Sequence, residues 1–221
     1  GPIFMHVQTF SRKVGKAGNN VHQVIGEATR TPEFSKHVDN PRPPHVIEGD
    51  PSRFRALHDA HVAERSTKVT VKGVQTQRAI RLDRHTLATI IASYPVTRAQ
   101  IEIGGGEALR HYGDWEYRTI AFVRKKYGTQ LKVVLAHDDE AFPHLHFWLL
   151  PDNPDADAKA LHPGKAAKMV VEVKAKAKGE EPRVAVKLGN EALKSAMRGF
   201  LDEYYCDVGE PLGMLRDGPK R

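Results

Sequence analysis

The chain has 221 residues, of which 40% are hydrophobic, and its formal net charge is +7 at pH 7. That length predicts a single domain with a sizeable core, and no apolar run is long enough to cross a membrane. The single cysteine, Cys206, excludes an intramolecular disulfide and a cysteine-based zinc site, and it favours a reducing cytoplasm. The positive charge favours a polyanionic partner, most commonly nucleic acid.

The first half of the chain predicts two strands and two helices around a proline-rich segment. Residues 4–10 alternate between apolar and polar and predict a strand, and residues 21–29 predict a short helix capped by Asn19 or Asn20. Residues 31–51 hold five prolines and predict an extended or looped chain. A helix capped by Asp50 or Ser52 then runs to about residue 64. Residues 87–94 predict the second strand.

The second half predicts two helices and two pairs of strands. Residues 112–127 have apolar side chains at helical spacing and stop at a glycine. Residues 132–136 and 147–150 predict strands on either side of a histidine-rich segment. Residues 168–176 and 183–187 alternate apolar with charged side chains, which predicts an appended basic β-hairpin at 165–188. Residues 191–205 predict a final amphipathic helix. This irregular order indicates an α+β fold with helices on one side of the sheet.

The segment between the two central strands predicts a metal site. His144 and His146 lie two residues apart on a strand, so they project from one face while Leu145 enters the core. His137 ends the neighbouring strand and adds a third imidazole, which makes an open site of three nitrogen ligands. The acidic residues at 138–140 offer carboxylates beside these ligands. The alternative is that the histidines are merely solvated at strand ends.

The same residues resemble a known motif. The pattern H-x-D-E-x-x-P-H-x-H over residues 137–146 resembles the third motif of MobV (Pre/Mob) plasmid relaxases, which belong to the HUH endonucleases. Weaker similarity extends over about residues 20–218, including the basic segment 78–83 and the glycine-rich segment 213–218. The resemblance implies an HUH-type fold, with a central antiparallel β-sheet flanked by helices, and a single relaxase domain over residues 1–221.

The resemblance also implies an activity. It implies site- and strand-specific nicking of single-stranded DNA at a plasmid or mobile-element transfer origin. The transesterification leaves the protein on the 5′ phosphate and is later reversed by religation. The implied ligands of a divalent cation, Mn²⁺ before Mg²⁺, are His137, His144 and His146, with Glu140 beside them. The implied partners are origin DNA with duplex or hairpin next to the nick, and accessory mobilization proteins, in the bacterial cytoplasm and away from membranes. The alternative function is a metal-dependent hydrolase that acts through bound water without a covalent DNA adduct.

The resemblance implies a histidine nucleophile. MobV members carry an early H-N-x-R motif, and His22 stands at the matching place, although Gln23 and Ile25 replace the asparagine and the arginine. A neutral imidazole is a competent nucleophile near pH 7, because its unperturbed pKa is about 6.5. A carboxylate such as Glu27 is expected to fix its tautomer. The rival histidines lie in the proline-rich segment: His37 and His45.

Basic side chains are expected to hold the DNA. Arg81, with Arg78 and Arg84 as substitutes, is expected to clamp the scissile phosphate through paired hydrogen bonds. Arg30 is expected to contact phosphate in place of the missing motif arginine. Further lysines and arginines are expected to track the DNA backbone, or, in the hairpin, to guard a solvated strand edge: Arg12, Lys13, Lys16, Lys174 and Lys176.

Overall fold

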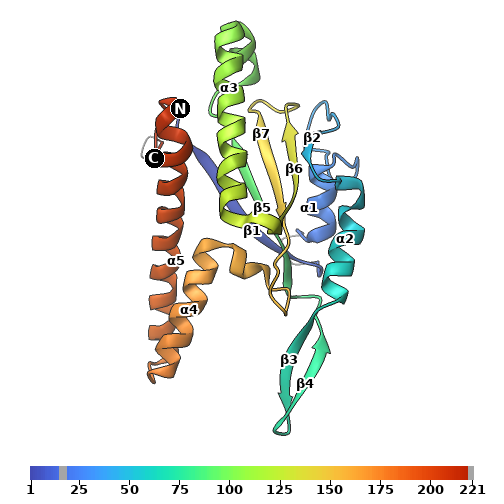
Figure 1. The fold of residues 1–221 in the computed structure, drawn as a ribbon, viewed down its shortest axis with the longest axis vertical. Coiled ribbons are helices and arrows are strands. Elements are labelled where there is room, and N and C mark those ends of the chain that lie inside the picture. The colour runs from blue at the N-terminus through green and yellow to red at the C-terminus, as the bar shows by residue number, and fades with distance from the viewer. Residues whose placement is uncertain (15–18, 219–221) are drawn as a thin grey trace.

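The computed structural model describes residues 1–14 and 19–218, so the predicted contact of Lys16 lies outside the described residues. Five antiparallel strands form the central sheet (Figure 1). The α+β class and the central antiparallel sheet are confirmed. In spatial order, the strands are β1 (Phe4–Ser11), β5 (His85–Ser93), β7 (His144–Leu149), β6 (Leu131–His137) and β2 (His45–Glu48).

Helices cover both faces of this sheet, so the expectation of helices on one side is wrong. Helices α1 (Val21–Ala28) and α2 (Pro51–Ala63) pack on the face that carries Trp148. Helix α3 (Arg98–Tyr127) and the carboxy-terminal part of α5 (Pro182–Tyr204) pack on the face that carries Phe147. The reason is that β6 and β7 are apolar at consecutive positions, and a strand that is apolar on both faces must be covered on both.

The predicted helix starts are confirmed by their caps. The Asn20 side chain accepts a hydrogen bond from the backbone N–H of Gln23, and the Gln23 side chain accepts one from the Asn20 N–H. The Asp50 carboxylate accepts hydrogen bonds from the N–H groups at the start of α2, where Pro51 holds the first helical position. Helix α3 begins at Arg98, earlier than expected, and has a kink at Gly105, where φ is 61°.

The segment predicted as a basic β-hairpin is helical. Helix α4 (Pro163–Ala177) and the first half of α5 lie side by side as an antiparallel pair (Figure 1). A proline starts each helix, and small residues let the two backbones approach: Gly164 lies against Leu193, and Gly189 against Glu172. Packing of these small residues across the pair therefore overrides the period-two pattern of the valines and lysines.

A two-stranded ribbon and several short turns complete the chain. Strands β3 (Ser66–Val71) and β4 (Val74–Ala79) pair only with each other and project from the body (Figure 1). Sequence analysis missed this ribbon and the short strand β2. Among the described residues, no helix combines the length and the apolar character needed to cross a membrane. The short helical turns are Gly128–Gln130, Ala158–Leu161, Tyr205–Gly209 and Glu210–Leu212.

Gly49 allows the chain to turn from β2 towards α2, and its replacement tests this part of the fold. Its φ is +77°, and a Cβ there would lie 2.0 Å from the carbonyl oxygen of Lys132. Gly49→Ala is therefore expected to lower the free energy of unfolding by about 3 kcal/mol, because strain at positive φ adds to a backbone clash. Gly73→Ala is the matched control: its φ is +82° with nothing within 4 Å, so about 1 kcal/mol is expected. Equal losses in urea denaturation would contradict this account.

Candidate metal centre

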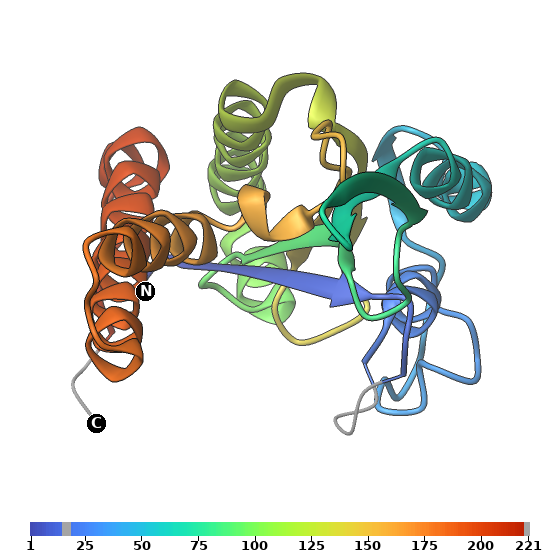
Figure 2. The same cartoon turned by 90° about the horizontal axis from the view of Figure 1, so that it is seen from below.

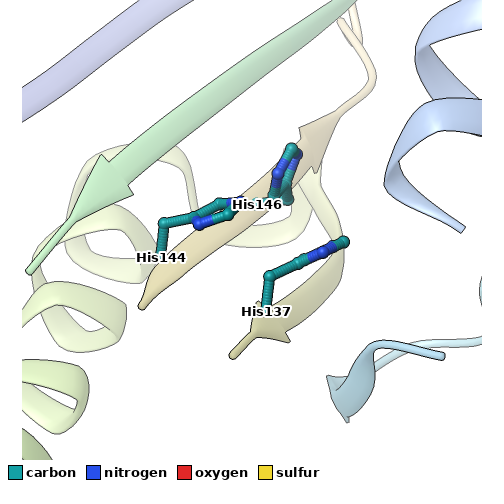
Figure 3. Close-up of side chains that lie close together, drawn as sticks. All are labelled: His137, His144 and His146. Carbon is teal, nitrogen blue, oxygen red and sulfur yellow. The ribbon is translucent and has the colours of Figure 1, made fainter. Parts of the chain in front are cut away.

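Three imidazoles converge on one face of the β6–β7 hairpin (Figure 3). His137 pairs directly with His144 across the two strands, and His146 pairs with Leu135. The ring centroids lie 4.6 to 5.1 Å apart. One ligand atom from each ring lies within 4.8 Å of the other two. The i, i+2 spacing on β7 and the end of β6 thus bring the three histidines together, as the sequence predicted.

The nitrogen atoms of this cluster are buried and fit a metal. His137 is 1% exposed, and neither of its ring nitrogens has a hydrogen-bond partner among the described residues. A buried polar atom without a partner is costly, and coordination to a metal would supply that partner. His144 donates its Nδ1–H to the carbonyl oxygen of Phe142 over 3.0 Å, which leaves the lone pair of Nε2 free.

Burial keeps the imidazoles of His137 and His146 neutral. Burial lowers the pKa of His137 to about 3, and the nearby Arg30 and His144 add to the effect. Burial also lowers the pKa of His146 well below its ordinary value, with His137 next in importance. Neutral imidazole is the form that binds metal, so protons do not compete at neutral pH. Three imidazole nitrogen donors suit a divalent transition metal.

Two carboxylates behind the cluster are held by one buried arginine. Arg30 donates from Nε and Nη2 to the two oxygens of Asp139, over 2.8 and 2.7 Å, and from Nη2 to Glu140 over 2.7 Å. Asp139 lies 3.7 Å from His137 Nδ1, and Glu140 lies 3.9 Å from His144 Nε2. The Arg30 side chain is 4% exposed. Arg30 therefore orients the carboxylates beside the histidines, and it has little exposed surface for the DNA contact expected of it.

Backbone hydrogen bonds hold the loop just after these two carboxylates. The N–H of Tyr94 donates to the carbonyl of Pro143 over 2.9 Å, and the N–H of Arg98 donates to the carbonyl of Ala141 over 3.0 Å.

Burial raises the pKa of Asp139, but the hydrogen bonds from Arg30 and from the N–H of Arg42 outweigh it and hold that pKa well below its usual range. Asp139 is therefore a fixed negative charge at neutral pH.

A cavity of about 320 Å³ opens beside His144 and His146. It contains a second imidazole–carboxylate pair, because His37 Nε2 lies 3.8 Å from Glu27 Oε1. The cavity gives the histidine cluster access to an outside molecule, which a sealed structural metal site lacks. Its described lining residues are Glu27, Arg30, His37, Ile91, Ser93, Glu140, Ala141, Phe142, His144 and His146.

His22 is placed less favourably than His37. It is exposed in the first turn of α1, and its ring packs edge-on against Phe34, 5.2 Å between centroids. It is not among the described residues that line the cavity. Glu27, expected to orient His22, pairs with His37 instead. Sequence analysis named His37 only as a rival, because nothing in a proline-rich segment indicates which way its side chains face.

The arginines expected to clamp a phosphate lie at the other end of β5. Ser93 pairs with His144, whereas Arg81 precedes the opposite end of that strand, at His85. The eight steps between the nine residues of β5, at about 3.3 Å each, place those two ends about 26 Å apart. Arg81 is bonded to Asp83, and Arg84 to Asp155 and Asp157. The structure therefore places Arg81 away from the histidine cluster, and its contact with the scissile phosphate stays a prediction.

The remaining predicted contact residues lie on projecting elements. Arg78 lies on strand β4 of the ribbon. Lys174 and Lys176 lie in the last turn of α4, where both side chains are exposed. The structure thus brings Glu140 and the three histidines together, and leaves these basic residues apart from them.

Comparison with solved structures supports this fold, whereas comparison with known sequences finds no match. No profile of a known family matches the chain, and no curated protein sequence matches it. Among solved structures, a manganese-bound crystal structure of the MobM relaxase domain (MOBV; Mob_Pre) with 22-nucleotide plasmid pMV158 oriT DNA, at pH 5.5, matches with a TM-score of 0.50. The sequences are 20% identical, and the match covers 80% of this chain and 84% of that one. The chain has the fold of the MobM relaxase domain.

Two further structures of the MobM relaxase domain match over the same share of each chain. One is bound to 26-nucleotide oriT DNA, with a TM-score of 0.44 and 18% identity. The other is manganese-bound at pH 6.8, with a TM-score of 0.42 and 17% identity. The match with a TM-score of 0.50 confirms the relaxase resemblance at the level of the fold.

Proposed function

We propose that the protein is a metal-dependent relaxase that nicks one strand of DNA at a plasmid or mobile-element transfer origin. The observation that carries this proposal is the cluster of three buried imidazoles beside an open cavity, on the fold of a domain solved with manganese and origin DNA. The net charge of +7 suits a polyanionic substrate.

Three residues hold the cation in this proposal: His137, His144 and His146. When bound there, a divalent ion polarises a phosphate oxygen and offsets the charge that develops as the phosphodiester is attacked. Mn²⁺ is the proposed ion and Mg²⁺ the alternative, because nitrogen donors suit manganese better than magnesium. Glu140, held by Arg30, places a carboxylate beside His144, which favours a cation in the cluster.

The proposed chemistry is a transesterification. An imidazole nitrogen attacks the scissile phosphorus, a nitrogen–phosphorus bond forms, and the bond from phosphorus to the 3′ oxygen breaks. The leaving 3′ oxygen takes up a proton, and the imidazole releases one from its other nitrogen. The protein then carries the 5′ phosphate, so the reverse reaction religates the strand without another energy source.

His22 is the proposed nucleophile, and His37 is its rival. The MobV resemblance supports His22, whereas the cavity supports His37, which lies there beside Glu27. Both residues are histidines near α1, so attack by either one would give the same type of adduct, with the 5′ phosphate bonded to an imidazole nitrogen. A comparison of variants separates them.

The decisive experiment incubates the protein with single-stranded origin oligonucleotides and Mn²⁺, followed by a denaturing gel. A covalent protein–DNA band supports the relaxase, free cut ends indicate a hydrolase that uses bound water, and intact DNA contradicts both. The variants His22→Ala and His37→Ala are run beside the wild type. The variant that loses the band identifies the nucleophile, and acid lability of the adduct verifies its nitrogen–phosphorus bond.

A further inference from the structure

The β3–β4 ribbon has the features of an element that contacts a partner molecule outside the chain. Its strands pair without a break from Ser66 with Ala79 to Val71 with Val74. A tight turn joins them, in which Lys72 and Gly73 both have positive φ. Every residue of β4 is exposed, and the ribbon extends away from the sheet and the helices (Figures 1 and 2). An isolated pair of strands is only marginally stable, so an external partner accounts for its length better than the core does.

The composition of the ribbon suits nucleic acid. Residues 66–79 contain three cationic side chains and no acidic one, and most of the others are threonine, glutamine or valine. A two-stranded ribbon fits the major groove of duplex DNA, about 12 Å wide, where glutamine and threonine hydrogen-bond to base edges. The three cations at its flanks and tip contact phosphates in that arrangement: Lys68, Lys72 and Arg78.

A cleft of about 320 Å³ at the base of the ribbon adds a second observation. Three arginines line it, Arg12, Arg65 and Arg78, and no acidic side chain does so among the described residues. Its walls join the ribbon to the end of α2 and to the end of β1. A concave surface with three guanidinium groups and no counter-charge is a site for an anion.

Backbone carbonyls hold these guanidinium groups without neutralising them. Arg12 Nη2 donates to the carbonyls of Ile80 and Arg81 over 2.6 and 3.2 Å. Arg65 donates from Nη1 to the carbonyl of His61 over 2.8 Å, and from Nε to that of Asn153 over 3.2 Å. The Nε of Arg12 is buried and has no hydrogen-bond partner among the described residues.

The neighbouring Arg84 shows the contrast. Its guanidinium lies 3.2 Å from Asp155 and 2.9 Å from Asp157, so two carboxylates already balance its charge. Arg12, Arg65 and Arg78 form no ion pair with any described carboxylate. The cleft therefore keeps an uncompensated positive charge next to a ribbon that is itself purely basic.

We propose that this arginine cleft binds a backbone phosphate of double-stranded DNA while the β3–β4 ribbon lies along the adjoining groove. The proposal rests on the proposed function, in which duplex or hairpin DNA lies next to the nicked strand. The cleft includes Arg12, which follows the end of β1 that pairs with His85, whereas the histidine cluster lies near Ser93, at the other end of β5, a strand about 26 Å long. One DNA molecule therefore bridges them, with its duplex part on the ribbon and its single strand at the histidines.

The test measures binding of a fluorescent DNA hairpin and of a single strand of equal length, in EDTA. Arg65→Gln/Arg78→Gln is expected to weaken hairpin binding about tenfold or more at low salt, and to reduce the salt slope of log K by about 2. Single-strand binding is expected to change less. The matched control removes two exposed charges from α3, Arg110→Gln/Arg118→Gln, and is expected to leave the preference for hairpin unchanged. Arg12→Gln is measured separately, with its thermal midpoint, because Arg12 also ties two chain segments together.

Three outcomes would overturn the proposal. Hairpin binding like that of the wild type shows that the cleft holds no DNA phosphate. If the double variant loses affinity equally for the hairpin and for the single strand, the ribbon does not contact a duplex groove. If inorganic phosphate at millimolar concentration binds the cleft equally well with and without DNA, the cleft is a site for a free anion. The binding assay contains no divalent metal and therefore does not depend on nicking. If the protein does not nick DNA, its affinities for the hairpin and the single strand can still be compared. If these affinities do not change as expected, the result of the nicking assay still stands.

Discussion

Replacing His146 with alanine is expected to abolish tight manganese binding and, with it, nicking. His146 is 7% exposed and its ring centroid lies 4.6 Å from that of His137, so it is one of the three imidazoles that form the cluster. Loss of a residue that only orients a metal ligand already costs 10- to 100-fold in affinity. Loss of the ligand itself is therefore expected to weaken Mn²⁺ binding more than about 100-fold. Calorimetric titration with Mn²⁺ measures the affinity directly.

The thermal midpoint gives an independent measurement of the same effect. A metal that binds only the folded state at 100 times its Kd adds about 2.7 kcal/mol to stability. Manganese is therefore expected to raise the midpoint of the wild type and to leave that of His146→Ala unchanged. The matched control is His45→Ala, since His45 is an exposed histidine on β2 outside the cluster. An equal manganese shift in His146→Ala would show that the cluster is not the metal site.

The parts of the fold that the sequence predicted are those set by local rules. Asn20 and Asp50 cap helices because their side chains accept hydrogen bonds from N–H groups two or three residues ahead. His144 and His146 share a face because a strand has a period of two. His137 joins them because a short connection between β6 and β7 forces neighbouring strands to pair. Each of these inferences needed fewer than about ten residues of context.

The parts that the sequence did not predict depend on distant partners. The segment at 165–188 has a strand-like pattern, but Ala175 and Ala185 become buried where two helices pack closely. Every residue of β4 is exposed, so no buried apolar face indicates that strand of the ribbon. Arg30 and Asp139 are separated by 109 residues, and no local rule pairs one arginine with one carboxylate over such a distance. For the same reason His37 was not recognised as a cavity residue.

Replacing Arg30 with methionine is expected to lower the free energy of unfolding by about 3–5 kcal/mol at pH 7. The Arg30 and Asp139 side chains are 4% and 1% exposed, so the substitution leaves a buried carboxylate without its cation. The matched control is Arg81→Met. Arg81 makes the same paired hydrogen bonds to Asp83, but those side chains are 81% and 50% exposed. Such a surface pair is worth at most about 1 kcal/mol. Urea denaturation in EDTA compares the two variants.

The dependence on pH distinguishes a lost ion pair from lost packing. In the wild type the pKa of Asp139 is held below its usual range, so the stabilisation is fully present above about pH 4 and is lost as the pH falls further. In Arg30→Met, burial raises that pKa, and folding takes up a proton instead of excluding one. The stability difference between wild type and variant is therefore expected to shrink as the pH falls from 7 towards 3. Arg30→Met/Asp139→Asn should recover part of the loss at pH 7, since it removes the unpaired charge. A difference that is constant with pH, and no recovery in the double variant, would mean that Arg30 acts through its volume alone.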